Sequence, residues 1–76
     1  MAVSQKEKTE ITHNQLKATA LKLFLDKGYE QTGIKEIAEN SGYAVGSFYR
    51  HWKSKQQILM EIWDDFASDF IRGSIE

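Results

Sequence analysis

The chain has 76 residues, no cysteine, no proline and a formal net charge of −1. This length accommodates one small domain, which buries only roughly 60% of the surface that its unfolded chain exposes. Without cysteine there are no disulfides or thiolate zinc sites, and His13 and His51 lie too far apart in sequence to predict a metal site. Residues 40–49, the longest uncharged run, are mostly polar and fall short of the ~20 apolar residues of a membrane span. Because the N-terminus also lacks a signal peptide, we expect a cytoplasmic protein with no membrane segment, metal or cofactor.

A polar arm at residues 1–8 precedes the first apolar pattern. From Thr9, apolar residues at helical spacing predict a helix of about five turns, with Thr9 or Thr12 as its N-terminal cap. Gly28 follows a lysine in the last turn and is expected to end this helix in a left-handed conformation. We interpret His13 as a residue of its polar face.

The second predicted helix is short, with Thr32 or Gly33 as its N-cap. It ends at Ser41-Gly42, because serine followed by glycine is a typical helix-breaking pair. Its inward residues are Ile34, Ile37 and Ala38.

A third helix is predicted from about Val45 to Trp52 because Phe48 and Trp52 have the i, i+4 spacing of a buried pair. Residues 40–44 join it to the second helix. Two short helices joined in this way, at about residues 33–52, are typical of a helix-turn-helix motif, whose second helix enters the DNA major groove.

A fourth helix begins at Ser54, which has the capping-box spacing to Gln57, and reaches about Arg72-Gly73. Its acidic residues, Glu61 among them, are interpreted as a solvated face. Its apolar stripe consists of Ile58, Leu59, Ile62, Trp63, Phe66, Phe70 and Ile71. The fold is therefore all-α: a three-helix, homeodomain-like DNA-binding domain at 9–57, and at 54–76 the start of a longer connecting helix.

The start of the third helix is narrow, as an approach to base edges requires. Gly46 is informative, because a glycine inside a helix costs about 0.5–1 kcal/mol relative to alanine. Close approach of the backbone to the duplex explains it, and the alternative is a glycine that merely extends the turn.

Residues 50–55 carry three fixed positive charges and a histidine beside the start of the fourth helix. Lys55 lies in the first turn, where a cation is unfavourable to the helix dipole unless an external anion binds there. The alternative is a solvated lysine. His51 lacks a neighbouring nucleophile or carboxylate in sequence, so phosphate contact and simple packing remain open.

The segments 32–38 and 46–55, together with Gly42, resemble the DNA-binding domain of the tetracycline-repressor (TetR) family of bacterial transcriptional regulators. The resemblance covers roughly residues 15–59 and includes Gly28-Tyr29 upstream. It implies a homodimer that binds an inverted-repeat operator in double-stranded DNA. It also implies a larger C-terminal domain, absent from this chain, that dimerises and binds a small-molecule effector.

The resemblance also implies roles for individual residues. Val45, Gly46 and Ser47 approach bases, while Tyr49 and His51 reach the backbone or a base. Lys55 holds a phosphate, and Lys35 faces phosphates together with the start of the second helix. For Arg50 we favour phosphate over guanine. The expected DNA-binding residues are Thr32, Gly33, Lys35, Val45, Gly46, Ser47, Tyr49, Arg50, His51 and Lys55.

Four positions depart from the family's usual residues. Gly33 replaces a hydroxyl residue, which leaves only its backbone N–H for a phosphate. Ala44 replaces a serine cap, Tyr43 replaces a small aliphatic residue, and Trp52 enlarges a phenylalanine. We expect the Tyr43 ring to fill the core with its hydroxyl outward.

We therefore predict a DNA-binding transcriptional regulator, a repressor released by its effector, and not an enzyme. The alternative is a helical protein–protein interaction module that uses the aromatic stripe of the last helix. A net charge of −1 disfavours DNA binding, but the charges are segregated. Residues 40–60 contain three basic and no acidic residues, whereas residues 61–76 contain five acidic residues and one basic.

Overall fold

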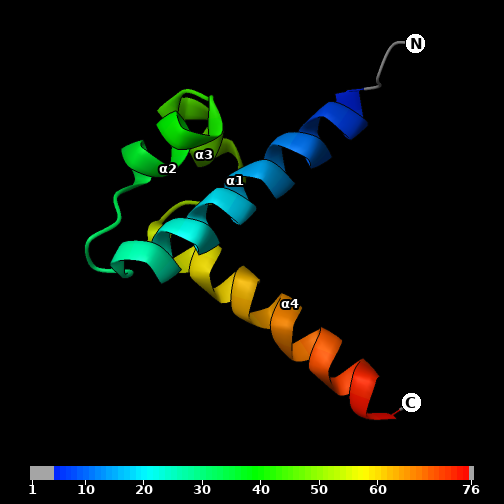
Figure 1. Cartoon of the computed structure of the whole chain (residues 1–76). Helices are drawn as coiled ribbons and strands as arrows, with labels where there is room; N and C mark the ends of the chain where they lie inside the picture. The colour runs from blue at the N-terminus through cyan, green and yellow to red at the C-terminus, as the bar shows by residue number, and fades with distance from the viewer. Residues whose placement is uncertain (1–4, 76) are drawn as a thin grey trace.

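The computed structural model describes the backbone of residues 5–75 and the side chains of residues 6–68. Its helices are α1 (Gln5–Lys27), α2 (Ile34–Ser41), α3 (Val45–His51) and α4 (Lys55–Ile75). Over the described backbone every regular element is helical, which confirms the all-α prediction. α1 contacts each of the other three helices, with α2 and α3 packed together at one side of it, while α4 leads away from them (Figure 1).

α1 begins at Gln5, four residues before the predicted start at Thr9. Neither predicted threonine caps it, and the Thr12 hydroxyl instead donates to the Lys8 carbonyl within the helix (3.0 Å). Glutamine, lysine and glutamate are good helix formers, and Glu7 in the first turn complements the helix dipole. The helix therefore includes the second half of the predicted arm, and residues 1–4 lie outside the described part.

Glycines end the first two helices as predicted. Gly28 (φ 95°) donates its N–H to the Phe24 carbonyl at the end of α1. Gly42 (φ 84°, ψ 21°) follows α2, where its N–H bonds the Glu39 carbonyl and the Tyr43 N–H bonds the Ala38 carbonyl. These two bonds form a Schellman motif, which requires the left-handed conformation at Gly42.

The capping box of α4 is confirmed in part. The Gln57 N–H donates to the Ser54 hydroxyl (3.3 Å), as predicted. The Gln57 side chain, however, accepts the N–H of Lys53 (2.9 Å), one residue earlier than the Ser54 N–H that a capping box uses.

The core lies where α1, α2, α3 and the first half of α4 meet. Phe48 of α3 is fully buried, and Trp52, directly after α3, is 4% exposed, so the predicted buried pair is confirmed. Tyr43 packs against this core, and its hydroxyl donates to Gln15. The buried hydrophobic cluster comprises Leu16, Ala20, Ile37, Phe48, Trp52, Ile58 and Ile62.

The second half of α4 projects beyond this core (Figure 1). Every residue of 63–68 is exposed, and the exposed fractions of Trp63 and Phe66 are 71% and 55%. These two residues match the predicted uncovered stripe, whereas the side chains of Phe70 and Ile71 lie outside the described residues. Over the described residues, no helix combines the length and apolarity needed to cross a membrane.

Two glycine substitutions test the backbone argument at the helix-turn-helix. Gly42→Ala should lower the free energy of unfolding by about 1–2 kcal/mol, because alanine is strained in the left-handed region. Gly46→Ala is the matched control and should raise it by about 0.5–1 kcal/mol, because Gly46 is helical. A Cβ at either position meets open space, so only the backbone differs. Urea denaturation measures the free energy of unfolding of both variants, and equal effects would contradict the left-handed conformation of Gly42.

Candidate nucleic-acid interface

The outer face of α3 is the candidate interface. Phe48 and Trp52 anchor the inner face, so the opposite face turns outward. On it, Gly46, Tyr49 and Arg50 are exposed, and Val45 and Ser47 are half-buried. Five of the six predicted DNA-binding residues of α3 are thus accessible at least in part, whereas the sixth, His51, is half-buried and lies against His13 of α1.

The N-terminus of α3 has no side-chain cap. Ala44 occupies the N-cap position in extended conformation (φ −79°, ψ 158°) and makes no side-chain cap bond, as its side chain dictates. Gly46 is the second residue of the helix and has no positive φ. It therefore does not extend the turn, and that alternative is wrong.

The start of α2 differs from the prediction at Thr32 and Gly33. Gly33 is the N-cap, and Thr32 is 1% exposed with its hydroxyl donating to the Gly28 carbonyl (2.8 Å). The Thr32 side chain therefore stabilises the loop and does not reach the surface. The Glu36 carboxylate, which has the capping-box spacing to Gly33, lies near enough to the Gly33 N–H for this donor to lower its pKa. Lys35 is exposed.

Glu36 is in turn tied to α1. The Lys27 ammonium lies 2.9 Å from its Oε1 and 2.7 Å from its Oε2. The bond from Lys27 is the main reason that the pKa of Glu36 lies below its ordinary value, with the Gly33 N–H contributing. The pair links the end of α1 to the start of α2.

Lys55 has a structural role that sequence reasoning missed. Its ammonium donates to the Tyr29 carbonyl (2.7 Å) and the Thr32 carbonyl (2.9 Å), and it lies 4.3 Å from the centroid of the Tyr29 ring. These contacts explain a cation in the first turn of α4, because the α1–α2 loop supplies the acceptors. An ammonium has three donors, so one N–H remains for a phosphate.

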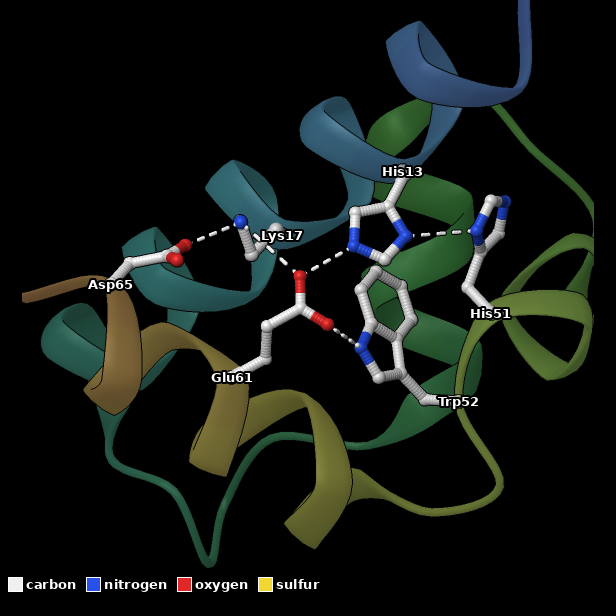
Figure 2. Close-up of polar contacts among 6 residues, drawn as sticks. All are labelled: His13, Lys17, His51, Trp52, Glu61 and Asp65. Carbon is white, nitrogen blue, oxygen red and sulfur yellow. Dashed lines mark hydrogen bonds and ion pairs between the residues drawn. The ribbon is translucent and has the colours of Figure 1, made fainter. Parts of the chain in front are cut away.

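A polar network behind α3 joins three helices (Figure 2). The Glu61 carboxylate of α4 lies at its centre. It accepts the Trp52 indole N–H (Nε1 to Oε1, 3.0 Å) and the Lys17 ammonium (Nζ to Oε2, 3.2 Å), and His13 Nε2 lies 2.5 Å from Oε2. Lys17 also bonds Asp65. Trp52 is therefore more than an enlarged phenylalanine, because its N–H fixes the end of α3 to α4.

The two histidines extend this network from α1 to α3. His13 Nδ1 lies 2.9 Å from His51 Nδ1, so one ring must donate and the other accept. Because His13 Nε2 faces a carboxylate, it carries a proton, and the neutral pair is completed by a proton on His51 Nδ1.

The network shifts two pKa values in the same direction. Partial burial lowers the pKa of His51, and the neighbouring His13 and Arg50 lower it further, while Glu61 opposes them. Partial burial alone raises the pKa of Glu61, but the bonds from His13, Trp52 and Lys17 outweigh it, so the pKa lies below its ordinary value. In both cases the folded state binds protons less readily than the unfolded chain.

Sequence reasoning missed this network and misassigned two of its members. Glu61 is not part of a solvated acidic face but a half-buried acceptor, and His13 is not a plain surface residue. His13 also stacks against Trp52, with ring centroids 4.4 Å apart. His51 and Glu61 lie 38 and 48 positions from His13, so no local sequence pattern predicts these contacts.

Acid should destabilise the fold in the range where histidine titrates. The unfolded chain takes up a proton at His51 near pH 6.5, whereas the folded chain does so at lower pH. The free energy of unfolding therefore falls as pH decreases through this window. Urea denaturation between about pH 7.5 and pH 5 measures the fall, and His51→Asn, which does not titrate, should reduce it. An unchanged pH dependence in His51→Asn would contradict this assignment. The contribution of Glu61 is lost separately, below about pH 4.5.

Known proteins match most of the chain. Residues 16–62 match the profile of the family described as bacterial regulatory proteins, tetR family. HTH-type transcriptional repressor KstR2 of Mycolicibacterium smegmatis is 37% identical over 60 residues, which are 79% of this chain and 29% of that protein. HTH-type transcriptional regulator AcrR of Shigella flexneri is 34% identical over 64 residues (84% and 30%). HTH-type transcriptional activator FasR of M. smegmatis is 29% identical over 59 residues (78% and 27%).

No solved structure matches the chain significantly. The chain spans less than a third of the length of these three relatives. The matched residues include the helix-turn-helix, the loop held by Lys55 and the first two turns of α4. The chain therefore belongs to the TetR family of bacterial regulatory proteins.

Proposed function

We propose that this chain is the DNA-reading part of a transcriptional regulator that inserts α3 into the major groove of operator DNA. The observation that carries the proposal is the outer face of α3. It presents small residues at its narrow start and hydroxyl and cationic groups along its length, on a helix anchored by buried Phe48 and Trp52. A groove of about 12 Å admits such a helix, and its walls are lined by phosphates.

The residues divide into base and phosphate contacts. Val45, Gly46 and Ser47 meet base edges, since a valine contacts a thymine methyl and a serine hydroxyl bonds either base type. Phosphates are bound by donors around this centre. These are Lys35, Tyr49, Arg50 and the remaining N–H of Lys55. His51, whose one N–H in the neutral ring bonds His13, joins them when its Nε2 takes up a proton.

The complete regulator is proposed to be a homodimer that acts in the cytoplasm on an inverted-repeat operator. Two copies of α3 must then match half-sites about 34–36 Å apart, or a multiple of this. A small-molecule effector in a further domain would change this separation and release the DNA. The exposed Trp63 and Phe66 on α4 support such a domain, because apolar patches of this kind mark contact surfaces. Repression would be steric, although one relative is named as an activator.

The same apolar surface supports a second candidate, a protein–protein interaction module. A groove between α1 and α4 is lined by Ala18, Leu21, Ile62 and Phe66. An amphipathic partner helix fits a groove of this kind. In that case the outer face of α3 has no nucleic-acid partner.

Titration with mixed genomic DNA fragments at low salt separates the two candidates. The DNA reader binds and loses affinity steeply as salt rises, because bound counterions are released from the phosphates. An interaction module shows no binding. Gly46→Ala sharpens the test: it should weaken operator binding while stabilising the fold, because its Cβ meets nothing in the free protein but faces the bases in the complex. Unchanged affinity in Gly46→Ala would contradict the docking of α3.

Lys55→Ala separates the two roles of this lysine. The loss of two hydrogen bonds from a charged donor should lower the free energy of unfolding by about 1–3 kcal/mol. Loss of a phosphate contact should also reduce the slope of log affinity against log salt by about 0.9. The free energy of unfolding is measured by denaturation, and the affinities are measured under conditions in which the variant is folded. Lys22→Ala, which removes an exposed lysine of α1, is the control for charge. A destabilised variant with an unchanged salt slope would show that Lys55 only holds the loop.

A further inference from the structure

A polar pocket of about 220 Å³ lies between the start of α1 and the outer face of α3. Lys8, Thr9 and Thr12 of α1 form one wall, and Ser47, Arg50 and His51 of α3 form the other. No acidic side chain lines it. The pocket therefore brings a lysine from outside the helix-turn-helix next to three residues proposed to contact DNA.

The chemistry of the lining suits an anion. Across residues 6–68, neither Lys8 nor Arg50 makes an ion pair, so two positive charges share the pocket without a negative partner. Like charges around a common space repel each other, and an anion between them removes this cost. The Thr12 hydroxyl already donates to the Lys8 carbonyl. The two charged groups of the lining are the Lys8 ammonium and the Arg50 guanidinium, and the Ser47 hydroxyl adds a neutral donor on the α3 wall.

We propose that this pocket binds one backbone phosphate of DNA, held jointly by Lys8 and Arg50. The proposal rests on the docking of α3 proposed above and extends the interface to α1. A phosphodiester is favoured over a free anion because one wall of the pocket is the face of α3 that would enter the groove. Phosphates line the rims of that groove, on either side of an inserted helix.

In this proposal Arg50 binds a phosphate and does not contact a base. It also makes α1 a clamp, because a phosphate bound by Lys8 and Arg50 connects the start of α1 to the last turn of α3. Ser47 lies at the edge between pocket and groove, so its hydroxyl reaches the same phosphate or the base beside it. Lys8 was missed in the sequence because it falls in the segment predicted as an arm.

The test is Lys8→Ala, with Lys6→Ala as the matched control. The control removes the same charge from the same helix, two positions away and rotated by about 200°. Affinity for a DNA duplex is measured as a function of salt for the wild type and both variants. Lys8→Ala should reduce the slope of log affinity against log salt by about 0.9, which corresponds to about an eightfold loss at 0.1 M relative to 1 M salt. Lys8→Arg should retain the wild-type slope.

The outcomes separate this inference from the proposed function. If the wild type binds no DNA, the proposed function itself fails. If the wild type binds and Lys8→Ala keeps its slope, or Lys6→Ala loses as much as Lys8→Ala, only the pocket assignment is overturned. Millimolar inorganic phosphate, followed by the amide NMR signals of Lys8 and Arg50, is the second arm. Saturable shifts with an unchanged DNA slope in Lys8→Ala would identify a free-anion site and overturn the proposal.

Discussion

The burial of Phe48 and Trp52 is the constraint on which the candidate interface depends. α3 has only seven residues, and isolated helices shorter than about 12–15 residues are marginal in water. Its N-cap makes no side-chain bond and its first turn contains no acidic residue, so local interactions do little to stabilise it. The helix therefore exists because Phe48 within it and Trp52 directly after it, 0% and 4% exposed, are packed against α1, α2 and α4. Because these buried contacts hold the helix in place, the exposed residues of its outer face are not needed to fix its position.

The hydrogen bonds of Glu61 add to this packing by fixing the orientation of α1, α3 and α4 relative to one another. A half-buried carboxylate requires donors, and these come from α1 (His13 and Lys17) and from Trp52 at the end of α3. Apolar contacts tolerate small rotations, whereas hydrogen bonds at 3 Å do not. A displacement of α4 relative to α1 would break bonds to both neighbours at once, so the three helices behave as one unit. In the proposed regulator, the bond between Glu61 and Trp52 connects a movement of α4 to the end of α3.

Most of the fold was predictable from local signals, whereas the contacts that orient it were not. Gly28, Gly42 and the Phe48–Trp52 spacing act within a few residues, so helix ends and core positions followed from the sequence. The start of α1 was misjudged because strong helix formers continue the helix past Thr9 to Gln5. Lys55 and Glu61 were misinterpreted because they bond residues distant in sequence: the Thr32 carbonyl lies 23 positions from Lys55, and Lys17 lies 44 positions from Glu61. Thr32 was misinterpreted because its hydroxyl bonds the Gly28 carbonyl across an irregular loop. The DNA contacts of the outer residues of α3 stay predictions.

The net charge of −1 is a poor guide to the interface because charges of both signs are unevenly distributed and three carboxylates are paired with lysines of α1. Lys27 pairs with Glu36, and Lys17 pairs with both Glu61 and Asp65. Over residues 6–68, Arg50 and Lys53 on the opposite side of this network make no ion pair. Exposed charges act over a screening length of about 8–10 Å in physiological salt, so a phosphate at the face of α3 responds to the cations near it and not to the net charge of the whole chain. In the proposed complex, the acidic residues of α4 from Glu61 onward disfavour orientations that bring this part of the helix to the duplex, which favours an approach by the α3 face and the basic start of α4.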